Sequence, residues 1–252
     1  MRDRDKTMRV GVFACFSGCA LLLASCSGNP KPAPPPEPTD TAQEVRVDPP
    51  ALVVESEVGA LDKDAIKEAF GAATPELEAC VAKGRRDKQP LLGGTIEAFL
   101  QIDGNGKAQI GYLTQSTLGD HTTEACIVNA LKARTWPKPQ GGKVGETRQQ
   151  LELGEPDTRS PVPWSDTDLG KGFVLIDKSL RQCRRKAGAG PMEVTFYVEP
   201  TKDGFSGRAK TAGVSMDDEK GLKAIDCLVK TLLGGHYPSP GSYAAKVSVM
   251  VQ

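Results

Sequence analysis

The chain has 252 residues, a formal net charge of zero and an aromatic content of 5%. Beyond the first 25 residues, 28 basic and 30 acidic side chains remain, which argues against a nucleic-acid-binding protein that relies on strong phosphate attraction. The few aromatic residues and the 19 prolines, which cluster early, favour small hydrophobic cores with an unfolded spacer over one large core.

Residues 1–25 have the layout of a bacterial export signal. Four basic side chains precede the apolar run GVFACFSGCALLLA, which is shorter than the roughly 20 residues of a membrane span. The next residues, Leu23-Ala24-Ser25-Cys26, resemble the lipobox of bacterial lipoproteins. That resemblance implies that Cys26 becomes the first mature residue and carries the lipid, and Ser27 after it points to the periplasmic face of the outer membrane. The alternative is an ordinary cleaved signal in which Cys26 is incidental.

Residues 26–50 contain most of the early prolines. Proline favours extended polyproline II structure, so this segment is expected to be a disordered, semi-rigid spacer between the lipid and the folded part. A proline-rich ligand for a groove-type partner is the weaker interpretation. The following ALVVESEV (51–58) predicts a short strand or an apolar extension of the first folded unit.

Residues 51–153 and 166–252 are predicted to be two copies of one unit, joined by a linker at 154–165. CIVNALKARTWPKP (126–139) and CLVKTLLGGHYPSP (227–240) correspond without a gap, and such a repeat decides the interpretation of the fold. The matched pairs are Cys126 with Cys227, Val128 with Val229, Leu131 with Leu232, Trp136 with Tyr237, Pro137 with Pro238 and Pro139 with Pro240.

Within the first copy, spacings of three and four predict helices, and alternation predicts strands. The elements expected are a helix over 61–83, strands over 95–102 and 107–116, a second helix over 122–134 and a third strand over 145–153. Gly71 and Pro75 leave open a break of the first helix into two pieces. Asp103-Gly104-Asn105-Gly106 predicts a hairpin turn, and Trp136-Pro137 predicts the end of the second helix.

The second copy repeats the same order. The elements expected are a helix over 168–186, a strand around 194–198, a strand over 206–214, a helix over 220–233 and a final strand over 244–252. Asp203-Gly204 is placed in the hairpin turn. Each copy is therefore predicted to have the order α-β-β-α-β, and the fold class is α+β.

Four cysteines, one on each predicted helix, lie in the expected folded part. An exported protein reaches an oxidising compartment, and four cysteines allow three disulfide connectivities. The duplication favours Cys80 with Cys126 and Cys183 with Cys227. A zinc site is the rival, but no CxxC spacing exists and neither His121 nor His236 lies at ligand spacing from a cysteine, so we expect no metal. Buried free thiols remain a third interpretation.

The unit resembles the AgmX/PglI-type C-terminal domain of bacterial envelope proteins. The residues that carry the resemblance are Cys80, Asp103-Gly104, Cys126 and Trp136-Pro137, and then Cys183, Asp203-Gly204, Cys227 and Tyr237-Pro238. That domain is similar to the TonB carboxyl-terminal domain, which is an interaction module. The resemblance therefore implies two tandem TonB-like modules with a non-enzymatic role.

Catalytic interpretations find little support in the sequence. It contains no G-x-S-x-G, H-E-x-x-H or G-x-x-x-x-G-K-[ST] motif, so no catalytic residue and no cofactor are expected. The run Asp217-Asp218-Glu219 is interpreted as a helix start, where negative charge is favourable. The DGNGK turn lacks the glycine and the glutamate that a calcium loop needs.

One patch near a helix end has a basic character: Arg181, Arg184, Arg185 and Lys186. Cations complement a helix C-terminus, and contact with an anionic envelope polymer or an acidic partner is the sharper hypothesis.

The function predicted is that of an envelope adaptor that pairs with a partner protein at an exposed sheet edge, either GETRQQLEL (145–153) or AAKVSVMVQ (244–252). The alternatives are a cell-wall or polysaccharide-binding lipoprotein and a purely structural one.

Overall fold

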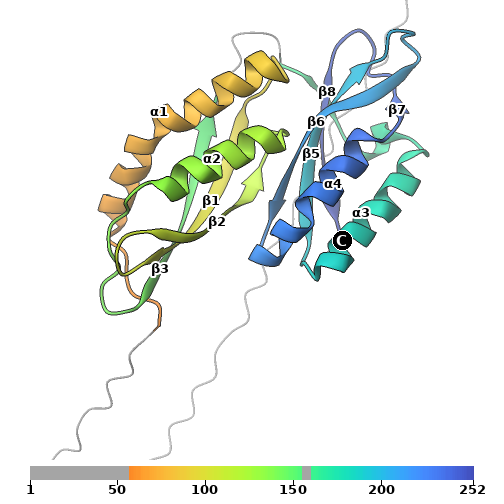
Figure 1. Ribbon diagram of the computed structural model, residues 1–252. Coiled ribbons are helices and arrows are strands. Elements are labelled where there is room, and N and C mark those ends of the chain that lie inside the picture. The colour runs from red at the N-terminus through yellow and green to blue at the C-terminus, as the bar shows by residue number, and fades with distance from the viewer. Residues whose placement is uncertain (1–56, 155–159) are drawn as a thin grey trace, which may run out of the picture. The chain divides into compact units, whose positions relative to one another are not determined.

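The computed structural model describes residues 57–154 and 160–252. These residues form a mixed α+β structure with four α-helices and two sheets (Figure 1). Cys26, the predicted export signal and the predicted spacer over 26–50 lie outside the described residues. Among the residues described, no helix has the length and apolar character that a membrane crossing requires.

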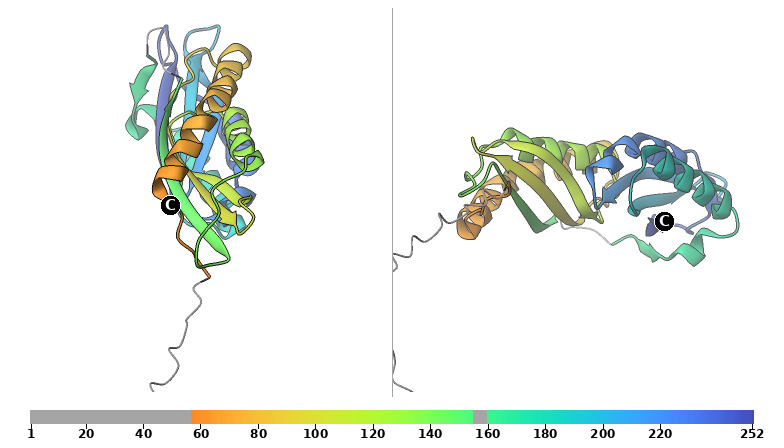
Figure 2. Two further views of the ribbon diagram at one scale, coloured as in Figure 1. Left: turned by 90° about the vertical axis from the view of Figure 1, so that its left-hand side faces the viewer. Right: turned by 90° about the horizontal axis from the view of Figure 1, so that it is seen from below.

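The first sheet has three antiparallel strands in the order β2-β1-β3. Its elements are α1 (Lys63–Asp87), β1 (Gly94–Asp103), β2 (Ala108–Ser116), α2 (His121–Ala133) and β3 (Val144–Leu153). Helices α1 and α2 cover one face of this sheet (Figures 1 and 2). Alternate residues of β1, namely Ile96, Ala98, Leu100 and Ile102, are buried in the core with residues of both helices.

The second sheet has the order β4-β8-β5-β6-β7. Its elements are β4 (Val162–Trp164), η1 (Asp166–Leu169), α3 (Phe173–Ala187), β5 (Met192–Pro200), β6 (Ser206–Met216), η2 (Glu219–Lys223), α4 (Ile225–Leu233), β7 (Tyr237–Pro238) and β8 (Ala245–Val251). Here α3 and α4 lie side by side over one face. The α-β-β-α-β order of the main elements thus occurs twice.

In each half, one disulfide joins the two helices, and both disulfides have the predicted connectivity. Cys80 and Cys126 link α1 to α2 with a Cα–Cα distance of 5.9 Å, and Cys183 and Cys227 link α3 to α4 at 5.7 Å. The predicted disulfide pairing is confirmed. On the chain-entropy argument, a closed loop of this length adds about 4 kcal/mol to the free energy of unfolding.

The repeated aromatic–proline pair has a specific structural role after α2 and α4. The Trp136 indole donates through Nε1 to the carbonyl of Leu131 at 2.9 Å, and the Tyr237 hydroxyl donates to the carbonyl of Leu232 at 2.7 Å. Both carbonyls lie in a last helical turn, and each also accepts a backbone N–H from just beyond the helix, Leu131 from Arg134 at 3.4 Å and Leu232 from Gly235 at 3.0 Å. The aromatic side chain therefore caps the helix that precedes it, while its ring packs in the core.

Helix α1 continues through Pro75. Gly71 and Pro75 therefore do not divide it into two pieces, an outcome that the sequence had left open. Proline inside a helix removes a hydrogen bond and costs about 3 kcal/mol. Burial of Phe70 before the proline and of Leu77 and Val81 after it holds both halves of the helix in one core. Tertiary packing thus outweighs the local cost.

The start of the second half differs from the predicted single helix over 168–186. A 3-10 turn, η1, comes first, with Ser165 as its capping residue, and α3 begins only at Phe173. Between them Gly170 has φ +68°, a conformation that favours glycine and ends the turn.

Part of the segment expected to be linker forms β4, which pairs in parallel with β8 through Val162 and Ala245. The first half has a similar feature, because Val58 forms a parallel bridge with Val144 in β3. In both halves a short stretch before the first helix therefore lies beside the last strand.

Candidate functional site

The two halves meet along β2 and β6, and each contributes side chains to the core of the other. Tyr197 of β5 is buried in the first core, and its hydroxyl donates to the Leu91 carbonyl at 3.1 Å. Phe99 and Tyr112 of the first sheet pack in the second core. The described residues accordingly form one compact unit.

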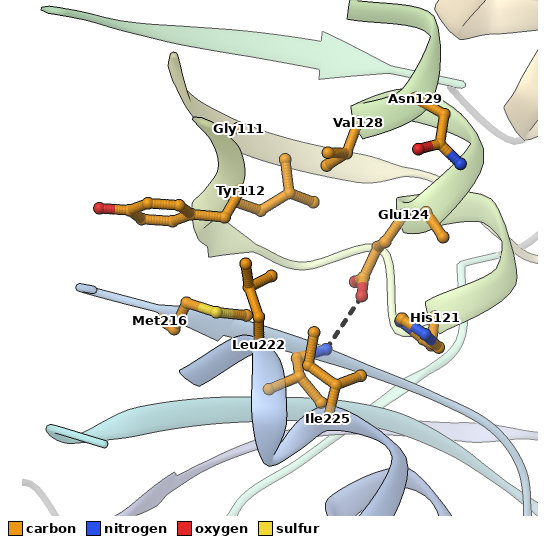
Figure 3. A pocket seen from close by; sticks show the side chains of 12 residues that line it. Gly111, Tyr112, His121, Glu124, Val128, Asn129, Met216, Leu222 and Ile225 are labelled. Carbon is orange, nitrogen blue, oxygen red and sulfur yellow. Dashed lines mark hydrogen bonds between the residues drawn. The ribbon is translucent and has the colours of Figure 1, made fainter. Parts of the chain in front are cut away.

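A buried carboxyl lies at the centre of this contact. Glu124, in the first turn of α2, has a relative exposure of 3%. Its Oε1 accepts from the Ser116 hydroxyl at 2.6 Å. Its Oε2 accepts from the Val214 N–H at 2.9 Å, the dashed line in Figure 3. Since Ser116 ends β2 and Val214 lies in β6, one side chain joins the two sheets.

The local sequence explains how Glu124 reaches β6. Asp120 is the N-cap of α2 and accepts from the Thr123 N–H at 3.0 Å, which fixes the first turn of the helix. Gly213 precedes Val214, and a Cβ there would lie 2.1 Å from Glu124 Oε1. A glycine at this position leaves the room that the carboxyl occupies.

Burial sets the charge state of this group. Removal from water is the largest effect and raises the pKa of Glu124 to about 7, while the hydrogen bonds from Ser116 and Val214 lower it and the charge of Asp120 raises it. Lys246, which donates to the Gly93 carbonyl, has a pKa lowered by burial to about 8. The carboxyl of Glu124 therefore gains or loses its proton near neutral pH.

A small pocket of about 130 Å³ lies beside Glu124, with mostly apolar side chains around it. His121 lines it, together with Val128, Met216 and Ile225 (Figure 3). In the residues that the structure describes, no group of three or more His, Cys, Asp or Glu side chains is placed to hold a metal ion. The arrangement can exchange a proton, and it joins the two halves.

Sequence reasoning missed Glu124, although the repeat carried a signal for it. Aligned on Cys126 and Cys227, Glu124 occupies the place of Ile225 in the second half. Such an exchange marks a position at which the two halves differ, but it does not by itself predict burial, because Lys132, which takes the place of Leu233, is exposed. His121 and His236 lie apart, in the pocket and in the exposed segment after α4 respectively.

The predicted sheet edges differ in how they are covered. The start of β3 is occupied, because Val144 donates to the Glu57 carbonyl at 3.1 Å and accepts from the Gly59 N–H at 2.7 Å. No described strand pairs with the outer side of β3 beyond that point. In contrast, β4 covers β8 from Ala245 to Val247.

Two of the four side chains in the predicted basic patch have partners within the protein. Arg181 pairs with Asp177 at 2.8 Å, and Arg184 donates to the Ala189 carbonyl at 2.9 Å beyond the helix end. Arg185 and Lys186 are exposed. The patch thus combines helix capping with an exposed positive surface.

The two predicted turn features have local roles. Asp103 accepts from the Asn105 and Lys107 N–H groups in the β1–β2 hairpin. Asp218 is the N-cap of η2 and accepts from the Lys220 N–H at 2.9 Å. Both carboxylates therefore accept hydrogen bonds from backbone N–H groups of their own turns.

Comparison of the chain with protein-family models, with curated proteins and with solved structures finds no match. The functional assignment therefore rests on the residues and contacts of this chain.

Proposed function

We propose that this protein is a non-enzymatic cell-envelope lipoprotein that acts as an adaptor, binding an extended segment of a partner protein at the outer edge of β3. It comprises two TonB-like modules that resemble the AgmX/PglI-type domain, carried on a proline-rich spacer from an acylated Cys26 at the periplasmic face of the outer membrane. The repeated α-β-β-α-β order supports the two modules.

The unpaired edge of β3 is the observation that carries the proposal. Both backbone groups of Val144 point outward, since they bond to Glu57 and Gly59. Backbone direction alternates along a strand, so the N–H and C=O groups of Glu146, Arg148 and Gln150 point outward as well. The backbone N–H and C=O groups of the odd-numbered residues between them point toward β1.

An edge of this kind is suited to strand addition. An added peptide supplies the missing main-chain hydrogen bonds, and its alternate side chains meet those of the edge. The exposed side chains here are Glu146, Arg148 and Gln150, whose charge and polarity protect an edge from indiscriminate pairing. Arg148 also lies over the Phe99 ring, at 5.6 Å from its centroid.

Crosslinking in intact cells tests the proposal. A photoreactive amino acid at Gln150 is expected to capture one defined envelope protein, identified by mass spectrometry. The same amino acid at Lys67, on the exposed side of α1, is the matched control and should not capture it. Equal capture from both positions, or none from Gln150, would argue against the edge.

Two neighbouring proline variants separate binding from folding. Gln150→Pro removes an outward N–H, a position where an edge strand tolerates proline, so the fold should persist while capture is lost. Gln149→Pro removes an N–H directed at β1 and should lower the thermal stability. Capture by folded Gln150→Pro at the wild-type level would contradict strand addition.

A further inference from the structure

Four large apolar side chains are exposed at one end of the second half, on three different elements. Their relative exposures are 67% for Val174, 75% for Leu175, 90% for Phe205 and 38% for Leu233. Val174 and Leu175 lie in the first turn of α3, Phe205 in the β5–β6 hairpin and Leu233 at the end of α4. We call these four residues the apolar end.

Contacts between neighbouring residues bring the segments that carry these four side chains to the same end of the second half. Ser206, next to Phe205, pairs with Pro238 of β7. A Cβ on Gly170, just before α3, would lie 3.1 Å from Pro238. Figure 1 shows the end of α4 and the beginning of α3 directed toward β7.

The first half provides an internal control, because it has the same elements without the apolar end. When the two halves of the sequence are aligned on Cys80 and Cys183, the buried residue Phe70 matches the buried Phe173, and Leu77 matches Leu180. At the four positions of the apolar end, aligned on the matching cysteines and turns, the first half has Gly71, Ala72, Asn105 and Lys132, all exposed. The fold therefore does not require large apolar side chains there.

The exposed side of α3 continues from the apolar end into a row of positive charge. The row consists of Lys171, which lies just before the helix, and of Lys178, Arg181 and Arg185. Their spacings of three to seven residues place them on the same side of a helix as Val174 and Leu175. Over its whole length α3 has five basic residues and one acidic residue, and that acid, Asp177, is paired with Arg181. The α1 positions that match this row are Glu68, Pro75, Glu78 and Ala82.

We propose that α3 and the apolar end form a docking surface for an anionic lipid bilayer. Apolar side chains that project from a hairpin and a helix start can enter the interface between headgroups and acyl chains, while neighbouring basic side chains attract anionic headgroups. The row of basic residues favours a negatively charged surface over a neutral apolar protein groove. The proposal uses α3 and the β5–β6 hairpin, and it is independent of the β3 edge.

Quenching by lipid tests the contact directly in the full-length chain. In Phe205→Trp, vesicles of phosphatidylglycerol with brominated acyl chains are expected to quench the new tryptophan. The control is Asn105→Trp in the equivalent hairpin of the first half, which has the same chain and the same N-terminal segment. Equal quenching of the two variants, or no quenching at position 205, would overturn the proposal.

Charge reversal tests the electrostatic part. Lys178→Glu combined with Arg185→Glu should lower partition into phosphatidylglycerol vesicles by at least about tenfold, since each basic residue near an anionic surface contributes on the order of 1 kcal/mol. Lys63→Glu combined with Lys67→Glu, at two exposed positions of α1, makes the same change of charge and is the matched control, which should lower partition much less. If the reversal weakens binding to a soluble polyanion but leaves vesicle partition and the quenching of Phe205→Trp unchanged, the occupant is a polymer and the proposal is wrong. Loss of lipid contact at α3 would leave the capture test at Gln150 unaffected.

Discussion

Replacement of Glu124 by glutamine is expected to remove a pH dependence from the stability of this protein. The amide is nearly isosteric with the protonated carboxyl. Its oxygen can accept from the Val214 N–H, and its NH₂ group can donate to the Ser116 oxygen, so both contacts persist without a titrating group. Glu124→Gln therefore resembles wild-type protein at low pH.

The magnitude follows from the change in pKa on folding. Burial raises the pKa of Glu124 from 4.5 to about 7. A group whose pKa is higher in the folded state contributes its stability below the unfolded pKa and loses it as pH rises through the folded pKa. The contribution of Glu124 to the free energy of unfolding should thus fall by roughly 3 kcal/mol between about pH 4.5 and pH 7.

Urea denaturation at a series of pH values measures the effect. The wild-type protein and Glu124→Gln share every other titrating group, so the difference between their unfolding free energies reports Glu124 together with its charge interaction with Lys246, whose pKa it raises. The wild type should lose about 3 kcal/mol relative to the variant as pH rises from about 4.5 to about 8. A difference that is constant with pH, or one in which the wild type gains stability with rising pH, would refute the reasoning.

Two other predictions concern the repeated motif. Tyr237→Phe removes the hydroxyl that caps the Leu232 carbonyl, so calorimetry should detect a loss of about 1–2 kcal/mol in the free energy of unfolding; a change near zero would mean that the Gly235 N–H, which donates to the same carbonyl at 3.0 Å, satisfies it alone. Cys183→Ser combined with Cys227→Ser should cost about 4 kcal/mol by loop entropy, read as a lower melting temperature than wild type without reductant. Because the bond between Cys80 and Cys126 remains in this double variant, reducing agent should lower its melting temperature further, by the contribution of that bond alone.

The two halves share a scaffold but differ in their surfaces. The first half carries an unpaired edge at β3, whereas β4 covers part of the equivalent strand β8 in the second. The second half carries the apolar end and the basic side of α3, which the first half lacks. The two halves therefore present two different candidate surfaces, one for a protein strand and one for a membrane.

Elements whose pattern is local were predictable from the sequence. The alternation along β1 and the Asp-Gly turns are set by neighbouring residues, and the structure has a strand and hairpins at these places. The disulfide connectivity was also predictable, because the duplication gave each half one cysteine on each helix. A local cost can mislead, as at Pro75, when packing on both sides of the residue holds the helix together.

The sequence by itself determined the repeat and the order of the main elements and favoured the observed pairing of the cysteines, since these depend on spacing along the chain. Only the tertiary structure decided that Glu124 bonds to Val214, that β4 covers β8 and that no described strand pairs with the outer side of β3 beyond Val144. Each of these depends on which distant backbone groups meet in space. The hydrophobic pattern sets which face of a strand is buried, but it does not specify what lies beside its edge.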